Sequence, residues 1–241
     1  MHASIGLISL DTMDKLHHRV AQVAVVDAYA ELSRLVSSLG GADFLRPSRC
    51  AGWAVGDVLY HVLLDAQRAL VTFATPAKRA PTIDHVSYWR NWQTNRNDLA
   101  AAAHGRFVRI AAAAYPEPGA LAHQWLDTAR AVAHVASGIP GSDVVATQSH
   151  ALTVTDFLST LAVEATVHHL DMLLELPGAP GPRPGAIELT VDVLDALLGP
   201  VKERPAWDDM TWILKATGRL PLTPAEERGL GPPVSRFPLI G

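Results

Sequence analysis

The clearest chemical signal in the sequence is a stripe of polar residues where a helix should present its core. A helix expected to begin near Thr153 carries at spacings of three and four Phe157, Leu161, Glu164, His168, Asp171 and Glu175. The first two are ordinary core residues, whereas the next three are ionisable and lie on the same face. An unpaired buried carboxylate costs several kcal/mol, so these groups must be paired, protonated or bound to a cation. Glu164 and His168 stand one turn apart, which suits two ligands of one metal ion.

A second helix, expected over residues 54–74, supplies a third ligand. His61 borders its apolar face, and Asp65 follows one turn later. If the two helices pack side by side, His61 meets Glu164 and His168 inside a bundle. Two imidazoles and one carboxylate match a catalytic zinc site with an open position, and Fe²⁺ or Ni²⁺ accepts the same set. The alternatives are a satisfied polar core and an exposed Glu–His pair without metal.

Proline and glycine divide the chain into the helices that must position these residues. Helices are expected over 15–39, 54–74, most of 84–114, 118–137 and 153–176, then over a segment from 187 to 198, near 208–217, and from 223 onward. No alternating strand pattern and no internal repeat stands out. We predict an all-α up-and-down bundle over residues 1–176, with a Pro-rich linker and a helical C-terminal extension over 177–241 that packs on the bundle.

Composition excludes several classes of function. The 241 residues are 49% hydrophobic and carry a net charge of −4, which argues against a dedicated binder of nucleic acid or anionic membranes. Apolar runs such as 110–114 are too short to span a bilayer, and residues 1–12 do not resemble a signal peptide, so we expect a cytoplasmic protein. The single cysteine, Cys50, excludes an internal disulfide and a multi-thiolate zinc site, and we interpret it as a small apolar filler. His169 points about 100° away from His168 and is not expected to be a ligand.

Two motifs resemble a known family. The segment Gly52-Trp53-Ala54-Val55-Gly56-Asp57-Val58-Leu59-Tyr60-His61 is similar to the Gly-Trp-x-x-x-Asp-Val-x-x-His signature of the mycothiol-dependent maleylpyruvate isomerase N-terminal domains, which are part of the DinB-like superfamily. The segment Glu164-Ala165-Thr166-Val167-His168-His169-Leu170-Asp171 resembles the second motif of that family, and the separation of the two also agrees. The stretch Thr217-Gly218-Arg219-Leu220-Pro221 is similar to the tail of many members.

The resemblance implies a DinB-like four-helix bundle in which His61, Glu164 and His168 bind a divalent metal, usually zinc, facing a pocket at one end. It also implies mycothiol as co-substrate, activated by the metal for attack on a small electrophile in a thiol transferase or isomerase reaction. Asp171 matches the family motif, and Asp65 is suggested by spacing alone, as acceptors for the second ring nitrogen of each histidine. Ala54 stands where many relatives have Thr or Ser, so the helix cap is expected to be weaker or supplied by another group. Residues 177–241 are too few for the separate α/β C-terminal domain of the isomerase, so maleylpyruvate is not assumed to be the substrate.

Two other functions stay open at this point. One is a non-enzymatic metal- or small-molecule-binding protein of the same fold, and the other is a structural bundle with a satisfied polar core. The expected partners are a low-molecular-weight thiol and a small electrophile, with no nucleic acid or membrane, and the chain is expected to be a monomer or homodimer.

Overall fold

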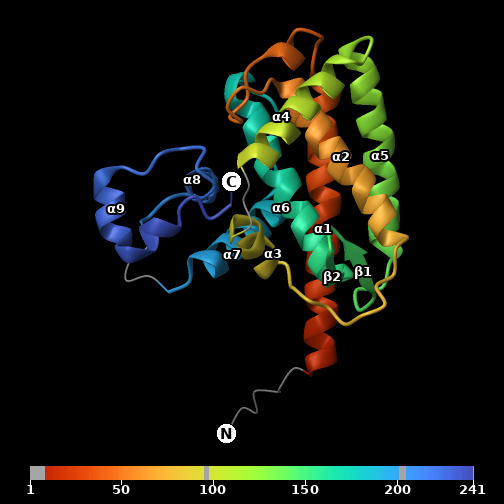
Figure 1. The fold of residues 1–241 in the computed structure, drawn as a ribbon, viewed down its shortest axis with the longest axis vertical. Helices are drawn as coiled ribbons and strands as arrows, with labels where there is room; N and C mark the ends of the chain where they lie inside the picture. Colours follow the sequence, from red (N-terminus) through yellow and green to blue (C-terminus); the bar gives the residue numbers. More distant parts are fainter. Residues whose placement is uncertain (1–8, 95–97, 201–204, 241) are drawn as a thin grey trace, which may run out of the picture.

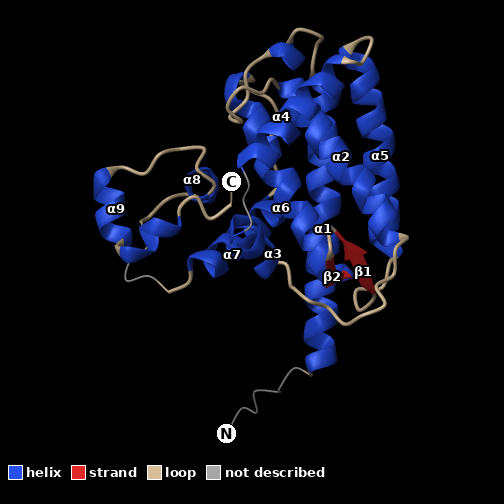
Figure 2. Ribbon diagram, in the orientation of Figure 1, coloured by secondary structure: helices blue, strands red, loops and turns tan. Residues whose placement is uncertain are grey.

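A computed structural model describes residues 9–94, 98–200 and 205–240, and helices make up most of them (Figures 1 and 2). The predicted all-α class is confirmed. Among the described residues, no helix is long and apolar enough to cross a membrane.

Four long helices form the bundle. They are α1 (Leu10–Ser38), α2 (Val55–Phe73), α5 (Pro118–Gly138) and α6 (Val154–Met172). Each of them packs against two of the others, with α1 beside α5 and α6, and α2 beside α5 and α6 (Figure 1). Their apolar faces share one hydrophobic core, which includes the buried side chains of Leu32, Leu59, Trp125 and Leu158.

The four helices do not alternate in direction, unlike in the up-and-down order that we predicted. His18, early in α1, contacts the carbonyl of Ile139, just after α5, so the start of α1 lies beside the end of α5. The chain after α2 also comes to that end of the bundle, because the Ala77 amide donates to the carbonyl of Val144. Thus α1 and α6 run away from this end, whereas α2 and α5 run toward it. The return from α2 to the start of α5 is made by α3 (Ser87–Thr94) and α4 (Asp98–Ala113), and α4 packs on α2. These two helices occupy most of the 84–114 segment that was expected to be helical.

The local signals for helix ends agree with the structure. Thr153 begins α6 as predicted, because its hydroxyl accepts a hydrogen bond from the Asp156 amide at 3.1 Å. Ala54 has no side chain to cap α2, and the Asp57 carboxylate instead accepts from the Ala54 amide at 2.9 Å. Asp57 thus supplies only one half of a capping box, and the Ala54 side chain accepts nothing from the first amides of α2, which agrees with the weaker cap that was expected.

A β-hairpin precedes α6, which the sequence analysis did not expect. Strands β1 (Val144–Thr147) and β2 (His150–Thr153) pair antiparallel, and the segment after α2 adds an isolated bridge from Pro76 to Val145. The turn uses Gln148 and Ser149, both with positive φ. Such two-residue turns are usually signalled by Asn-Gly or Asp-Gly, so the sequence here lacked the usual marker.

The C-terminal residues pack on one side of the bundle. Helix α7 (Pro184–Leu198) lies against α1 and α6, and α8 (Asp209–Ala216) lies against α7 and α6. A second hydrophobic cluster contains side chains of α7 and α8 together with Val163, Val167 and Leu170 of α6. Leu230 of α9 (Pro224–Leu230) also belongs to this cluster. Helix α6 is consequently buried on two sides, and its polar stripe lies between two apolar clusters.

Candidate metal centre

The three predicted ligands lie together. His61 is in the first half of α2, whereas Glu164 and His168 are one turn apart on α6, and one donor atom from each lies within 4.8 Å of the other two. His168 Nε2 is 3.2 Å from Glu164 Oε2, and the His61 and His168 rings meet edge to face with centroids 4.7 Å apart. The packing of α2 against α6 thus achieves the convergence that the sequence predicted. That these residues bind a metal stays a prediction.

The far side of the His168 ring is held by Asp171. His168 Nδ1 is 3.0 Å from Asp171 Oδ2, and Asp171 is fully buried. Burial opposes ionisation of Asp171, but the hydrogen bond with His168 and the Arg219 guanidinium hold its pKa well below the usual range. Burial likewise opposes the charge on His168, and its contacts with Asp171, Cys50 and Glu164 more than offset this, so its pKa is raised in the metal-free protein. The carboxylate fixes the ring with Nε2 toward Glu164, as the spacing of Asp171 predicted.

Cys50 packs against the hydrophobic core, as expected of a small apolar filler, but it also belongs to the polar cluster around Asp171. Its thiol donates to Asp171 Oδ2 at 3.1 Å, and its sulfur lies 3.9 Å from His168 Nδ1. The loop before α2 is anchored there because the Arg49 amide donates to the Asp171 carbonyl at 3.0 Å. One feature of the sequence could have predicted this position. Cys50 lies just before the motif that contains His61, and that motif was expected to pack beside the last turns of α6.

His61 has different neighbours from those expected. Its Nε2 lies 3.6 Å from Asp65 Oδ2, too long for a hydrogen bond, whereas its Nδ1 lies 3.3 Å from Nε2 of His104 on α4. Burial, and next the charge of His168, lowers the pKa of His61 to about 3. The imidazole is therefore neutral at pH 7, which is the form that binds metals.

Sequence reasoning missed His104. It lies in an alanine-rich helix with no spacing relation to His61, and only the packing of α4 on α2 brings the two rings within 5.3 Å, centroid to centroid. Trp53 contributes to this packing, since its ring lies edge to face with His61 at 5.5 Å. Helix α4 comes close to the indole at Gly105, where an added Cβ would lie 3.4 Å from Trp53 Nε1. Trp53 thus acts as a packing residue at the entrance of α2.

Two carboxylates beside the histidines, Asp65 and Glu164, have shifted pKa values of opposite direction. Burial, and next the charge of Glu164, raises the pKa of Asp65 to about 7. Burial also opposes the charge on Glu164, but the hydrogen bond and charge of His168 hold its pKa below the ordinary value. Within the described part of the chain, Asp65 Oδ2 is buried and has no hydrogen-bond partner. A buried, unpartnered carboxylate oxygen next to two other donors is the pattern expected beside a cation.

A second set of close donors comprises Cys50, His168 and Asp171. It uses Nδ1 of His168 rather than Nε2, and Asp171 already accepts two hydrogen bonds from Arg219 at 3.1 and 3.0 Å. The charge of Asp171 is thus matched by Arg219, whereas among the described residues no lysine or arginine forms an ion pair with Asp65. The donor set of His61, Glu164 and His168 is therefore the better candidate for a cation. His169 lies outside both sets, with Nε2 2.8 Å from the Pro180 carbonyl, as expected.

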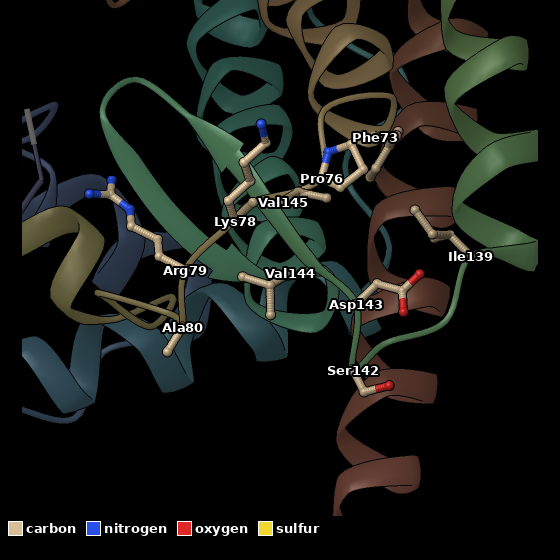
Figure 3. Close-up of a pocket in the computed structure, with 11 residues that line it drawn as sticks. Phe73, Pro76, Lys78, Arg79, Ala80, Ile139, Ser142, Asp143, Val144 and Val145 are labelled. Atoms are coloured by element: carbon tan, nitrogen blue, oxygen red, sulfur yellow. The ribbon is translucent and has the colours of Figure 1, made fainter.

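Two cavities differ in their relation to the site. A small one of about 20 Å³, roughly the space of one water molecule, borders Asp65 and Glu164 and is lined further by Tyr88, Gln148 and Thr160. A larger one of about 650 Å³ lies at the other end of α2, between Phe73, residues 76–80 and strand β1 (Figure 3). None of the predicted ligands lines the larger cavity.

Comparison with known proteins identifies one similarity. The family model described as the mycothiol maleylpyruvate isomerase N-terminal domain matches residues 25–173. The matched range includes His61, Glu164 and His168, and it ends before the C-terminal helices. No curated protein and no solved structure matches the chain.

Proposed function

Because the chain belongs to the mycothiol maleylpyruvate isomerase N-terminal domain family, we propose that it uses a divalent cation, most simply zinc, to activate a low-molecular-weight thiol. His61, Glu164 and His168 would hold the cation. The observation that carries the proposal is the convergence of these three side chains, from segments about one hundred residues apart, to within 4.8 Å.

The donor chemistry fits such a cation. Zinc takes imidazole nitrogen and carboxylate oxygen, and three protein donors leave a position open, while Fe²⁺ or Ni²⁺ accepts the same set. His61 is held neutral by burial, and His168 is oriented through Nδ1 by Asp171. The unpartnered oxygen of Asp65, 3.6 Å from His61 Nε2, adds negative charge at the same place.

The protein's own residues prepare the site. Asp171 and His104 contact the Nδ1 atoms of His168 and His61, and each contact limits rotation of its ring. The Glu164 and His61 side chains are 28% and 17% exposed, so a small molecule can approach them from solvent. A bound divalent cation would lower the pKa of a thiol beside it, which is otherwise near 8.5.

The reaction that follows is transfer of the thiol to a small electrophile. The sulfur forms a bond to carbon, and either a leaving group departs to give a thioether or the thiol later leaves to give an isomer. Family membership favours mycothiol as this thiol. The proposed partners are therefore the thiol and the electrophile, with the chain acting as a monomer or homodimer.

The small cavity favours a second candidate function. A space of roughly one water molecule beside Asp65 and Glu164 leaves little room for a substrate within the bundle. A protein of this fold that binds a metal or a small molecule without turning it over would show the same donor set.

Metal analysis is the first test. Protein purified without chelator should contain about one zinc, iron or nickel ion per chain, and H61A should lose it while H134A, in an exposed histidine of α5, should retain it. A wild-type protein free of metal, and unable to take up added Zn²⁺, would refute the proposal.

Turnover separates the two candidates. The zinc-loaded protein, mycothiol and a haloarene should give a thioether faster than the same mixture with H61A. A wild-type rate equal to that background over a series of electrophiles would support the binding protein instead.

A further inference from the structure

The Asp171 carboxylate, which contacts Nδ1 of His168, accepts hydrogen bonds from a residue in the C-terminal part of the chain. Arg219 Nε donates to Asp171 Oδ1 at 3.1 Å, and Arg219 Nη2 donates to Asp171 Oδ2 at 3.0 Å. The arginine side chain is 14% exposed and the aspartate side chain is fully buried. Paired parallel hydrogen bonds between guanidinium and carboxylate fix the plane of the carboxylate as well as its charge.

The end of α8 delivers Arg219 to this position. Gly218 has φ of +73°, which turns the chain after α8, and a Cβ at this residue would lie 3.2 Å from Pro238 Cβ. The Arg219 amide then donates to the Leu214 carbonyl, and Arg219 Nη1 donates to the Thr217 carbonyl at 2.8 Å. Backbone and side chain are therefore both held, so the guanidinium reaches Asp171 from a defined direction.

The orientation of Asp171 passes directly to the predicted ligand. Oδ2 of Asp171 receives Arg219 on one side and meets Nδ1 of His168 at 3.0 Å on the other. A rotated carboxylate would lose this contact, and the His168 ring would be free to turn Nε2 away from Glu164. Groups that orient a metal-bound imidazole in this way typically contribute 10- to 100-fold to metal affinity.

We propose that Arg219 is a positioning residue of the metal centre, so that the C-terminal extension completes a site whose ligands all lie in the bundle. The inference rests on the proposed cation site. The matched family model ends at residue 173, so the role of Arg219 is argued from its contacts with Asp171. A chain truncated after α6 would keep His61, Glu164 and His168 but would lose the hydrogen bonds from Arg219 to Asp171.

Zinc affinity in a double-mutant cycle tests the proposal. Competition with a chromophoric chelator would measure the dissociation constant of Zn²⁺ for the wild type, R219M, D171N and the double variant of the full chain. We expect R219M to weaken zinc binding about tenfold or more, and to add less than about twofold in the D171N background. An equal effect of R219M in both backgrounds, or none in the wild-type background, would overturn the inference.

A matched variant controls for general damage to the extension. Arg236 donates to the Leu198 carbonyl in the same C-terminal region, and its hydrogen bonds do not include Asp171. R236M should bind Zn²⁺ within about twofold of the wild type, and its Co²⁺-loaded form should keep the wild-type visible absorption spectrum, whereas the spectrum of R219M should change. If R236M weakens Zn²⁺ binding as much as R219M does, the loss of affinity results from general damage to the C-terminal extension, and the inference fails. If the wild type itself binds no zinc, it is the proposed function that fails.

Discussion

Replacing Asp65 with asparagine tests whether this part of the bundle is built around a positive charge. Burial, and next the charge of Glu164, raises the pKa of Asp65 from 3.8 to about 7. The folded, metal-free protein therefore binds the proton of Asp65 more tightly than the unfolded chain does. The contribution of Asp65 to the free energy of unfolding is therefore greatest below about pH 4 and falls as the pH rises toward 7.

The size of the effect follows from the two pKa values. A carboxyl held at about 7 in place of 3.8 lowers the stability of the folded state by up to ~4 kcal/mol above pH 7. The Asp65 side chain is 23% exposed, and solvent reduces the penalty, so we expect about 2 kcal/mol. D65N removes the charge and should stabilise the metal-free protein by this amount at pH 8, with a smaller gain at pH 5.

Urea unfolding of metal-free protein at the two pH values measures this difference. D192N, which changes an exposed carboxylate of α7, serves as the control and should show no comparable gain. Saturating Zn²⁺ should reduce the difference in unfolding free energy between D65N and the wild type, because a cation stabilises the wild-type carboxylate. The reasoning would be refuted if D65N were no more stable than the wild type at pH 8, or if this difference were equal at both pH values.

Four further predictions address other contacts. H61A should bind Zn²⁺ at least about 100-fold more weakly than the wild type in a chelator competition, because it removes a direct ligand, and an unchanged affinity would exclude His61 from the site. C50A should weaken zinc binding by a few fold in the same assay and C50S should not, because a hydroxyl still donates to Asp171; equal affinities of the two variants would contradict this. T153A should lower the free energy of unfolding by about 1 kcal/mol in urea, because the Thr153 hydroxyl caps α6, whereas E188A, at an exposed position inside α7, should change it by less than about 0.5 kcal/mol. G218A should destabilise the protein by about 1 kcal/mol or more and also weaken zinc binding, because it strains the turn that places Arg219; a loss of stability with unchanged zinc affinity would separate that turn from the metal centre.

The parts of the fold that depend on local signals could be predicted from the sequence. Helix α6 begins at Thr153 as expected, and the apolar periodicity of α2 and α6 indicates which faces pack together. Because ionisable residues interrupt these periodic stripes, His61, Glu164 and His168 stand out from the residue pattern alone. The contact between Asp171 and His168 follows in the same way from a spacing of three on one helix.

Apart from the convergence of His61 with Glu164 and His168, contacts between segments distant in sequence could not be predicted. His104 reaches His61 because α4 packs on α2, and no periodicity within either helix encodes that packing. Arg219 reaches Asp171 through a turn beyond α8, and Cys50 does so from a loop. The hairpin was missed for a different reason, since Gln148 and Ser149 adopt positive φ without the glycine or asparagine that usually marks such a turn.

The return path from α2 to α5 has a consequence for the surroundings of His61. Since α2 and α5 run in the same direction, the chain must travel back along the bundle, and it does so in α4, which lays His104 over His61. The order of the bundle helices and the surroundings of His61 are therefore linked. A connection that took another path would leave that side of the imidazole uncovered and would expose the buried Val108 of α4.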